Sequence, residues 1–175
     1  MPITSETVTL AGSGLVFQNS YDPSVTDGYR AAILTAETYL QNDALFGDDG
    51  GDIVYGNLGN DSCDGGAGDD LIRGGQGDDV LTGGDGADWI SGDRGSDTMT
   101  GGAGGDIFHS FSGAGIDVVT DFNPSDGDRV QVDTGTIYTL RQSGAHTVVD
   151  MGNGDELVLK NVTLSTLPPS WIFTA

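Results

Sequence analysis

Aspartate residues recur at intervals of nine through the middle of this chain. From Gly47 to His109 the sequence divides without gaps into nonapeptide blocks, and the sixth residue of every block is an aspartate: Asp52, Asp61, Asp70, Asp79, Asp88, Asp97 and Asp106. Carboxylate oxygens are the ligands that hard divalent cations such as calcium require. A carboxylate repeated at a fixed interval therefore predicts a series of cation sites.

Glycines frame each of these aspartates. The first and fourth residues of every block are glycine: Gly47, Gly56, Gly65, Gly74, Gly83, Gly92 and Gly101 at the first position, and Gly50, Gly59, Gly68, Gly77, Gly86, Gly95 and Gly104 at the fourth. Glycine permits positive φ angles and close approach of two backbones. The first six residues of a block are therefore expected to form a tight turn, whose carbonyl oxygens add to the carboxylate as ligands.

The last three residues of each block are expected to form a short strand that positions the turn. The eighth residue is always apolar: Val54, Cys63, Ile72, Leu81, Ile90, Met99 and Phe108. Side chains alternate along a strand, so the eighth residue points to the opposite face from the seventh and the ninth. The pattern predicts two sheets with the eighth residues packed between them.

These blocks resemble the GGxGxDxUx nonapeptide of the RTX (repeats-in-toxin, hemolysin-type) calcium-binding family. The resemblance is tight over residues 47–109. Upstream, Asn42–Leu45 fits a degenerate eighth block with Asp43 as its aspartate, and downstream Gly113–Val119 resumes the pattern two residues out of phase. The second glycine of the family is replaced by residues that tolerate left-handed turn geometry: Asp48, Asn57 and Asp93.

The resemblance implies a right-handed parallel β-roll in which two nonapeptides make one coil. Turns eighteen residues apart would then stack, with Asp52, Asp70, Asp88 and Asp106 along one edge and Asp43, Asp61, Asp79 and Asp97 along the other. Calcium would lie between stacked turns, held by these aspartates and by turn carbonyls of the glycine-framed loops. The stacked pairs imply roughly five Ca²⁺ ions, and a sixth if Asp43 pairs with Asp61.

The flanks of the repeats suggest three parts within an all-β fold. Residues 1–42 are expected to form an N-terminal cap with short strands at Thr7–Leu10 and Leu15–Phe17 and an amphipathic helix over Thr26–Gln41, where apolar residues follow helical spacing. Residues 43–117 would form the calcium-binding β-roll. Residues 118–175 would form a C-terminal flank of antiparallel strands: Arg129–Asp133, Thr136–Gln142, Thr147–Met151 and Glu156–Val162.

Charge and composition narrow the class of partner. The chain has 175 residues and a net charge of −21, which disfavours a nucleic-acid partner because phosphate binding needs positive charge. No run approaches the roughly 18 apolar residues of a membrane span. Without counter-ions, charge repulsion should keep the chain poorly folded. A single cysteine, Cys63, allows no internal disulfide and is interpreted as a core residue.

No catalytic constellation is visible. The two histidines, His109 and His146, are tied by spacing to no nucleophile or base, and neither an HExxH nor a GxSxG motif occurs. The sequence favours a non-catalytic calcium-binding module that folds on calcium binding after secretion. Export would follow a type I route, as the resemblance implies, because no N-terminal signal peptide is visible and the apolar C-terminal end, Leu167–Phe173, suits an uncleaved signal.

Two other functions stay open. One is a calcium-dependent carbohydrate-binding or adhesive accessory module of a secreted enzyme or surface protein. Its polysaccharide or protein partner would bind the outward apolar stripe, defined as Ile53, Leu71, Trp89 and Ile107 and flanked by Tyr55 and Arg73; the stripe could instead be covered by another part of the chain. The other is the tail of a secreted hydrolase whose catalytic part is absent.

Overall fold

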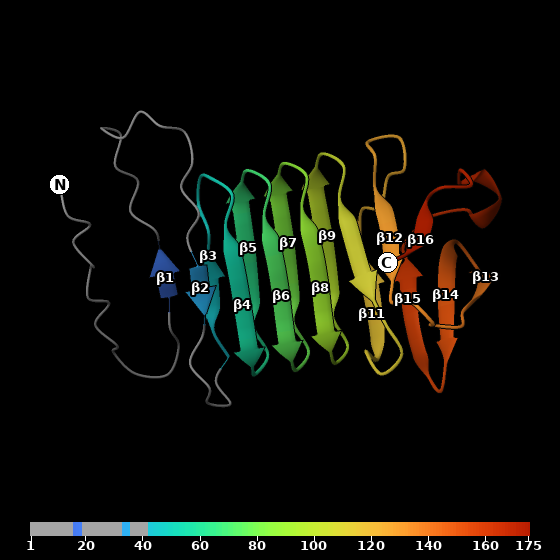
Figure 1. Ribbon diagram of the computed structural model, residues 1–175, viewed down its shortest axis with the longest axis horizontal. Coiled ribbons are helices and arrows are strands. Elements are labelled where there is room, and N and C mark those ends of the chain that lie inside the picture. The colour runs from blue at the N-terminus through green and yellow to red at the C-terminus, as the bar shows by residue number, and fades with distance from the viewer. Residues whose placement is uncertain (1–15, 19–32, 36–41) are drawn as a thin grey trace.

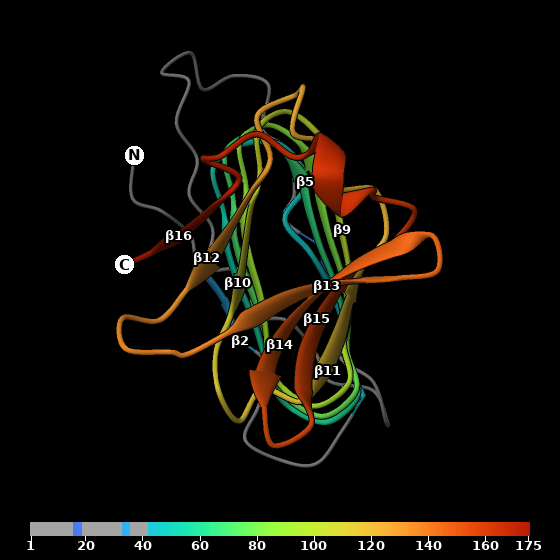
Figure 2. The same ribbon diagram turned by 90° about the vertical axis from the view of Figure 1, so that its right-hand side faces the viewer.

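The protein is a two-sheet parallel β-solenoid. Its computed structural model describes residues 16–18, 33–35 and 42–175, and Figure 1 shows the coils stacked along the long axis of the molecule. Seen from the C-terminal end in Figure 2, the two sheets face each other and the turns close both edges. In the described part of the chain no helix has the length and apolar character needed to cross a bilayer.

The chain alternates between the two sheets. The nine-stranded sheet contains, in spatial order, β1 (Val16–Gln18), β3 (Ala44–Phe46), β5 (Ser62–Ala67), β7 (Val80–Asp85), β9 (Thr98–Ala103), β11 (Ile116–Val119), β15 (Asp155–Leu159), β14 (His146–Gly152) and β13 (Thr139–Ser143). The seven-stranded sheet contains β16 (Ile172–Thr174), β12 (Arg129–Val132), β10 (Ile107–Ser110), β8 (Trp89–Arg94), β6 (Leu71–Gln76), β4 (Ile53–Leu58) and β2 (Ile33–Thr35).

Strand register in the repeats confirms that two nonapeptides make one coil. Each strand pairs in parallel with the strand eighteen residues later, as Val54 does with Ile72 and Cys63 with Leu81. The residues that replace the second glycine adopt positive φ as expected, at 68° for Asp48, 74° for Asn57 and 70° for Asp93. All turns on one edge therefore superpose along the solenoid.

The core between the sheets is a file of eighth-position side chains, as predicted. All are at most 1% exposed: Val54, Cys63, Ile72, Leu81, Ile90, Met99 and Phe108, with Leu45 one block upstream also fully buried. Position eight is the one side chain per block that both sheets enclose.

Truncating one of these side chains should destabilise the calcium-loaded protein strongly. Ile72 is 0% exposed, and an Ile→Ala change in such a core costs about 2–5 kcal/mol. Val80→Ala is the matched control, because Val80 is 52% exposed and should change stability by less than about 0.5 kcal/mol. Urea unfolding in saturating calcium measures both, and equal losses for the two variants would contradict this core.

The helix predicted over Thr26–Gln41 is wrong for Ile33–Thr35, which is strand β2. These residues pair in parallel with β4, Ile33 with Ile53 and Thr35 with Tyr55. The physical reason is that the first coil offers an open strand edge, and its unpaired backbone groups take a strand more readily than a helix. The rest of that helix and the strand predicted at Thr7–Leu10 lie outside the described residues. The strand predicted at Leu15–Phe17 is found one residue later, as β1.

The C-terminal flank is only partly antiparallel, which corrects the expectation for two of its strands. β12 runs parallel to β10, with Phe108 opposite Val130, and β15 runs parallel to β11. β13, β14 and β15 form the predicted antiparallel meander. The last coil leaves both sheet edges open, so the flank first extends each sheet in parallel and then ends the nine-stranded sheet with a hairpin (Figure 2).

Candidate metal centre

The repeat aspartates form two buried ladders, one along each edge of the solenoid. One carboxylate oxygen, Oδ1, accepts the backbone N–H of the aspartate eighteen residues earlier: Asp61 N–H donates to Asp79 Oδ1 at 2.7 Å, and Asp70 N–H donates to Asp88 Oδ1 at 2.8 Å. The same bond joins Asp43 to Asp61, Asp52 to Asp70, Asp79 to Asp97 and Asp88 to Asp106. The structure thus places these aspartates on the two edges that the repeat implied.

The second carboxylate oxygen is left without a donor. In six of these aspartates Oδ2 is buried and accepts no hydrogen bond within the described chain: Asp61, Asp70, Asp79, Asp88, Asp97 and Asp106. Burying a carboxylate oxygen without a partner is costly, and a repeated cost of this kind calls for a missing ligand. These buried Oδ2 atoms therefore form a row of acceptors on each edge, and each of them lacks a positively charged or hydrogen-bond-donating partner.

A backbone carbonyl converges on four of these acceptors, Asp61, Asp70, Asp79 and Asp88, at the first glycine of the block. A Cβ placed on Gly65 would strike Asp70 Oδ2 and would lie 2.7 Å from the Gly83 carbonyl oxygen. We call this space, with its carboxylate and its carbonyl, a cradle. The same cradle recurs at Gly47, Gly56, Gly74 and Gly83. Each cradle joins a turn to the turn stacked on it one coil later.

The donor set of the cradles fits calcium. All donors are oxygen, which suits a hard cation and not one that prefers nitrogen or sulfur. Within residues 42–175 and the two short described strands before them, no three His, Cys, Asp or Glu side chains gather into a metal site. Calcium takes about 6–8 oxygens, so turn carbonyls would have to supply most of the ligands around each carboxylate.

The fourth-position glycines lie outside the cradles, where each turn contacts the turn of the preceding coil. A Cβ on Gly68 would strike the carbonyl of Gly50, and a Cβ on Gly77 would strike that of Gly59; the same holds for Gly86, Gly95 and Gly104. These glycines adopt positive φ, 133° at Gly68 and 136° at Gly77. They allow successive turns to touch, which sets the spacing of the cradles.

Burial raises the pKa of the ladder carboxyls. Desolvation is the largest cause, opposed by the backbone N–H bond and reinforced by neighbouring aspartates; it lifts the pKa from 3.8 to about 6 in Asp70 and to about 7 in Asp79 and Asp88. Without a cation, the folded ladders therefore favour protonated carboxyls.

The metal-free protein should accordingly be more folded in acid than at neutral pH. A carboxyl with a raised folded-state pKa contributes stability that is complete below its unfolded pKa and is lost as pH rises through its folded pKa. We expect the β signal of the calcium-free chain in circular dichroism to grow from pH 8 to pH 4, with the gain beginning near pH 7 and accumulating down to about pH 4. In calcium the opposite trend should appear, because protons compete with the cation. A calcium-free chain with no gain of structure in acid would contradict this account.

Two further aspartates, missed at the sequence level, end the ladders. Asp97 N–H donates to Asp117 Oδ1 at 3.1 Å, and Asp106 N–H donates to Asp128 Oδ1 at 3.0 Å. Their spacings from the preceding aspartate are 20 and 22 residues instead of 18. The signal for Asp117 was present, since Gly115-Ile116-Asp117 keeps the Gly-x-Asp spacing of the repeat.

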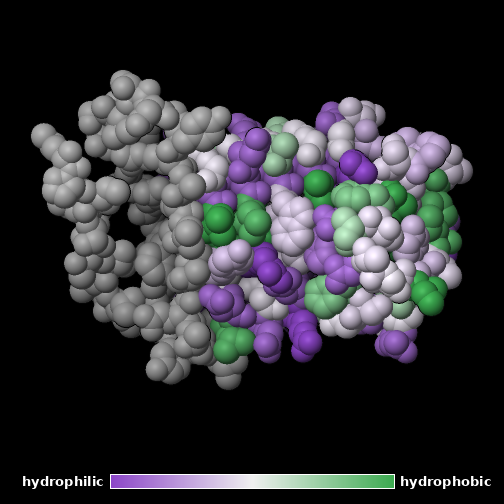
Figure 3. Space-filling model, in the orientation of Figure 1, coloured by the Kyte–Doolittle hydropathy of each residue, from purple (hydrophilic) through white to green (hydrophobic). Residues whose placement is uncertain are grey.

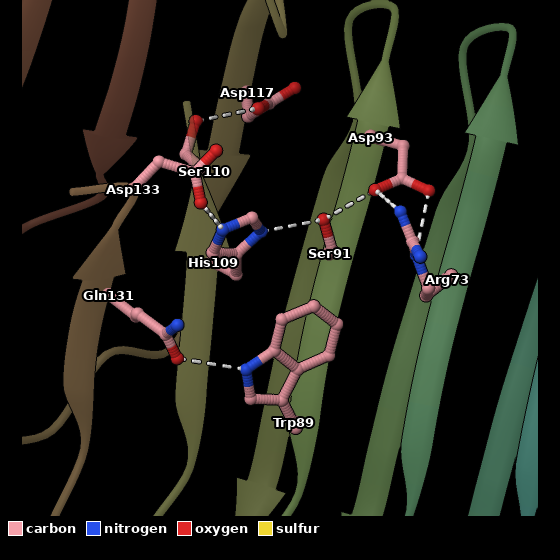
Figure 4. A network of polar contacts seen from close by, with 9 residues as sticks. All are labelled: Arg73, Trp89, Ser91, Asp93, His109, Ser110, Asp117, Gln131 and Asp133. Atoms are coloured by element: carbon pink, nitrogen blue, oxygen red, sulfur yellow. Dashed lines mark hydrogen bonds and ion pairs between the residues drawn. The ribbon is translucent and has the colours of Figure 1, made fainter. Parts of the chain in front are cut away.

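The outer face of the seven-stranded sheet carries a separate polar network (Figure 4). Asp93 pairs with Arg73 through two bonds of 2.8 and 2.9 Å and accepts a bond of 2.9 Å from Ser91 Oγ. Ser91 Oγ lies 3.2 Å from His109 Nδ1, and His109 Nε2 lies 3.0 Å from Asp133 Oδ1. A serine, a histidine and an aspartate are thus brought together from three strands or their ends.

This network lacks the features of a hydrolytic triad. Ser91 is 0% exposed, so no substrate carbonyl can reach its hydroxyl. Its one proton is donated to Asp93, which leaves His109 Nδ1 to donate to Ser91, the reverse of the transfer that activates a nucleophile. We interpret the network as structural: its hydrogen bonds and ion pairs link strands β6, β8 and β10 to the end of β12.

The apolar stripe is continuous but half-buried. Ile53, Leu71, Trp89 and Ile107 are neighbours in register, and each is partly exposed. The Trp89 indole N–H donates to Gln131 Oε1 at 3.1 Å, and its ring stacks on His109 with centroids 5.0 Å apart. The face drawn in Figure 3 carries small hydrophobic areas separated by hydrophilic side chains.

Beside the network lies a groove of about 480 Å³ on the same face. Its lining includes Tyr55, Arg73, Arg94 and Phe111. Two arginines at one groove stand out in a chain that has 6 basic and 27 acidic residues. Asp93, which pairs with Arg73, also lines the groove. Two arginines and one aspartate still leave the groove less negative than the aspartate-rich edges, so an anionic or hydroxyl-rich ligand meets less repulsion there.

One protein family matches the repeats. The RTX calcium-binding nonapeptide repeat family matches at residues 39–72 and 73–108. No curated protein sequence matches the chain.

Two of the solved structures that are similar to this chain are an extracellular lipase and a subunit of an epimerase. One is the extracellular lipase LipA from Serratia marcescens, with 17% identity, a TM-score of 0.45 and coverage of 77% of this chain, which spans only 38% of the lipase. The other is the AlgE6R2 subunit of the Azotobacter vinelandii mannuronan C5-epimerase, with 22% identity, a TM-score of 0.45 and coverage of 88% of this chain and 97% of the subunit.

Proposed function

Because residues 39–108 of this chain are RTX calcium-binding nonapeptide repeats, we propose that the chain is a non-catalytic calcium-binding module that is secreted and folds when it meets calcium. The observation that carries the proposal is the cradle. A buried Oδ2 and a carbonyl oxygen from the next coil meet at the first glycine of a block, as at Gly65 and Gly74. Five such cradles support a capacity of about five Ca²⁺ ions.

The energetics support folding that depends on the ion. The chain carries a net charge of −21, and its ladders bury carboxyls that resist ionisation. A ligand that binds only the folded state stabilises it by about 2.7 kcal/mol per site at a hundredfold excess over Kd. Five sites together would contribute about 13.5 kcal/mol, which lies within the roughly 5–15 kcal/mol that separates folded from unfolded states in ordinary domains.

The proposal also includes the domain organisation of the chain and its export from the cell. The calcium-binding unit is assigned to residues 43–117, between an N-terminal cap at 1–42 and a C-terminal flank at 118–175. Low intracellular calcium would leave the repeats open for export, and high extracellular calcium would close them. The apolar C-terminal end, Leu167–Phe173, is the candidate for the export signal.

The proposal is tested by titrating the chelated chain with calcium at pH 7.5 and, separately, with magnesium. We expect a β signal in circular dichroism to appear with calcium and not with magnesium, because magnesium demands small octahedral cages and gives up its water reluctantly. A chain that is already folded in chelator at this pH, or that folds equally in magnesium, would overturn it.

The groove at Arg73 and Arg94 supports a second candidate function, a calcium-dependent carbohydrate-binding accessory module. Tyr55 and Phe111 offer aromatic surfaces for sugar rings, and the arginines offer donors for hydroxyl or carboxylate groups. A glycan array probed with and without calcium tests it, with Arg94→Ala as the groove variant and Arg141→Ala as a control on the distant β13 strand. Binding that both variants retain would exclude the groove.

A further inference from the structure

The hydrogen bonds of the outer network fix the charge of His109, because each bond needs one proton between its two heavy atoms. Asp93 accepts two bonds from the Arg73 guanidinium, so it is a carboxylate that can only accept. Ser91 Oγ lies 2.9 Å from Asp93 Oδ1 and donates its single proton there. The contact of 3.2 Å between Ser91 Oγ and His109 Nδ1 therefore takes its proton from the histidine (Figure 4).

The other ring nitrogen of His109 carries a second proton. Nε2 lies 3.0 Å from Asp133 Oδ1, and the Asp133 side chain is 56% exposed. A solvated carboxylate accepts hydrogen bonds and donates none, so the proton of this contact also belongs to the histidine. A ring that donates from both nitrogens is a positively charged imidazolium.

The aromatic surroundings of the ring suit a cation. His109 is 9% exposed and stacks on two aromatic rings, with centroids 5.0 Å from Trp89 and 5.9 Å from Phe111 and an angle of 27° to each. The face of an aromatic ring attracts a positive charge, and it does so more strongly where water is excluded.

The charged groups that face His109 come from three strands or their ends. Asp133 follows β12 and contacts the ring directly. Asp93 of β8 lies behind Ser91, and Arg73 of β6 is paired with that carboxylate. Arg129 of β12 lies over the Phe173 ring, 4.0 Å from its centroid. Within the described part of the chain, Asp133 is therefore the carboxylate that pairs with the imidazolium itself.

The same count gives the opposite state for the second histidine of the chain, His146. Its Nδ1 accepts the backbone N–H of Asn161 at 3.0 Å. A backbone N–H can only donate, so this Nδ1 carries no proton and the ring is neutral, with its proton on Nε2. The neutral His146 thus serves as an internal reference for the charged His109.

We propose that the protonated His109 is a pH-dependent link that holds the C-terminal strands on the calcium-binding repeats. The ring belongs to β10, and its two protons bind β8 through Ser91 and the end of β12 through Asp133. β16 in turn pairs with β12. A ring that loses one proton can no longer donate to both partners, so one contact is lost. The link acts at constant calcium and therefore goes beyond the proposed function.

The sign of the pH effect follows from this link. A group that binds its proton more tightly in the folded state contributes stability that is complete below about pH 6.5, where histidine in an unfolded chain titrates, and that is lost as the pH rises further. The strands β12 and β16 should therefore loosen in mildly alkaline solution while the calcium-bound repeats stay folded.

Nitrogen-15 spectra of the imidazole rings test the charge directly in the full wild-type chain. At pH 7.5 in saturating calcium, we expect two protonated ring nitrogens in His109 and one in His146, with the unprotonated nitrogen of His146 at Nδ1. A neutral His109 under these conditions would overturn the proposal.

Amide hydrogen exchange in saturating calcium tests the link. His109→Gln keeps one donor and one acceptor but cannot carry the charge. At pH 6.5 the amides of β12 should exchange about tenfold faster in this variant than in the wild type, which is the effect of a one-unit difference in proton binding. At pH 9 the two proteins should exchange equally. His146→Gln is the matched control and should follow the wild type at both pH values. An equal ratio of His109→Gln to wild type at the two pH values would show that the ring acts through packing alone, which would also overturn the proposal.

Discussion

Chelating calcium from the folded protein at pH 7.5 is expected to expand it to the dimensions of an unfolded chain. A compact chain of 175 residues has a radius of gyration of about 16 Å, and an unfolded one of that length has about 44 Å. The solenoid is somewhat elongated, so its folded value should lie slightly above the compact figure. Small-angle scattering before and after chelation measures the change.

The expected expansion has two physical sources. Removing the ions leaves buried oxygens such as Asp70 Oδ2 and Asp79 Oδ2 without a partner, and it leaves the charge of −21 uncompensated. Adding salt alone screens the charge but supplies no ligand, so about 0.5 M sodium chloride should recover only part of the compaction. Full recovery in salt without calcium would mean that coordination contributes nothing.

Gly83→Ala is expected to abolish one calcium site and to cost about 3 kcal/mol of stability in calcium. Gly83 does not have a positive φ, so strain is not the reason. Its added methyl would strike Asp88 Oδ2 and lie 2.5 Å from the Gly101 carbonyl oxygen, which fills the cradle itself. Calorimetric titration with calcium should therefore show one ion fewer, together with a lower urea midpoint.

Gly105→Ala is the matched control for that substitution. It adds the same methyl to a glycine of the same repeat region, where the nearest atom is the Asp126 carbonyl oxygen at 3.2 Å and no Oδ2 is in reach. It should keep the full number of ions with a small loss of stability. A Gly83→Ala protein that binds as many ions as the wild type would show that calcium does not occupy the cradle.

The repeat region could be predicted because local and global requirements agree there. In a nine-residue period that ends in an alternating triplet, the apolar side chain at the eighth position is the one that points between the sheets, so the sequence alone identifies the eighth residues as the core. The stacking of turns eighteen residues apart came from the family resemblance. Neither argument could show that Oδ1 is consumed by a backbone N–H and that Oδ2 alone remains for the metal.

The structure of the flanks was harder to predict, because strand pairing between residues far apart in the sequence decides it. Helical spacing over Thr26–Gln41 is a local signal, and for Ile33–Thr35 it was overridden by the open edge of β4. Alternation in Arg129–Asp133 identified a strand, but alternation does not say whether the partner runs parallel. The Gly152–Asp155 turn was different, because a hairpin turn itself identifies the two strands that pair. The β14–β15 hairpin is found there as predicted.

The polar network on the outer face could also be predicted only in part from the spacing of its residues. Ser91 and His109 are 18 residues apart, so the coil period alone places them side by side. Asp133 lies 24 residues after His109 and outside the period, so its bond to His109 could not be foreseen from spacing. The constellation looks catalytic by residue type and is excluded by burial and proton direction, which no spacing rule reports.

Crystals grown in calcium and measured at a wavelength with calcium anomalous signal would locate the ions directly. Anomalous peaks are expected between stacked turns, each within about 2.3–2.6 Å of an aspartate Oδ2 and of turn carbonyls, beginning with the cradles at Gly65, Gly74 and Gly83. Peaks confined to exposed carboxylates, or turns that hold no ion at saturating calcium with the buried Oδ2 atoms still unpartnered, would contradict calcium binding in the cradles.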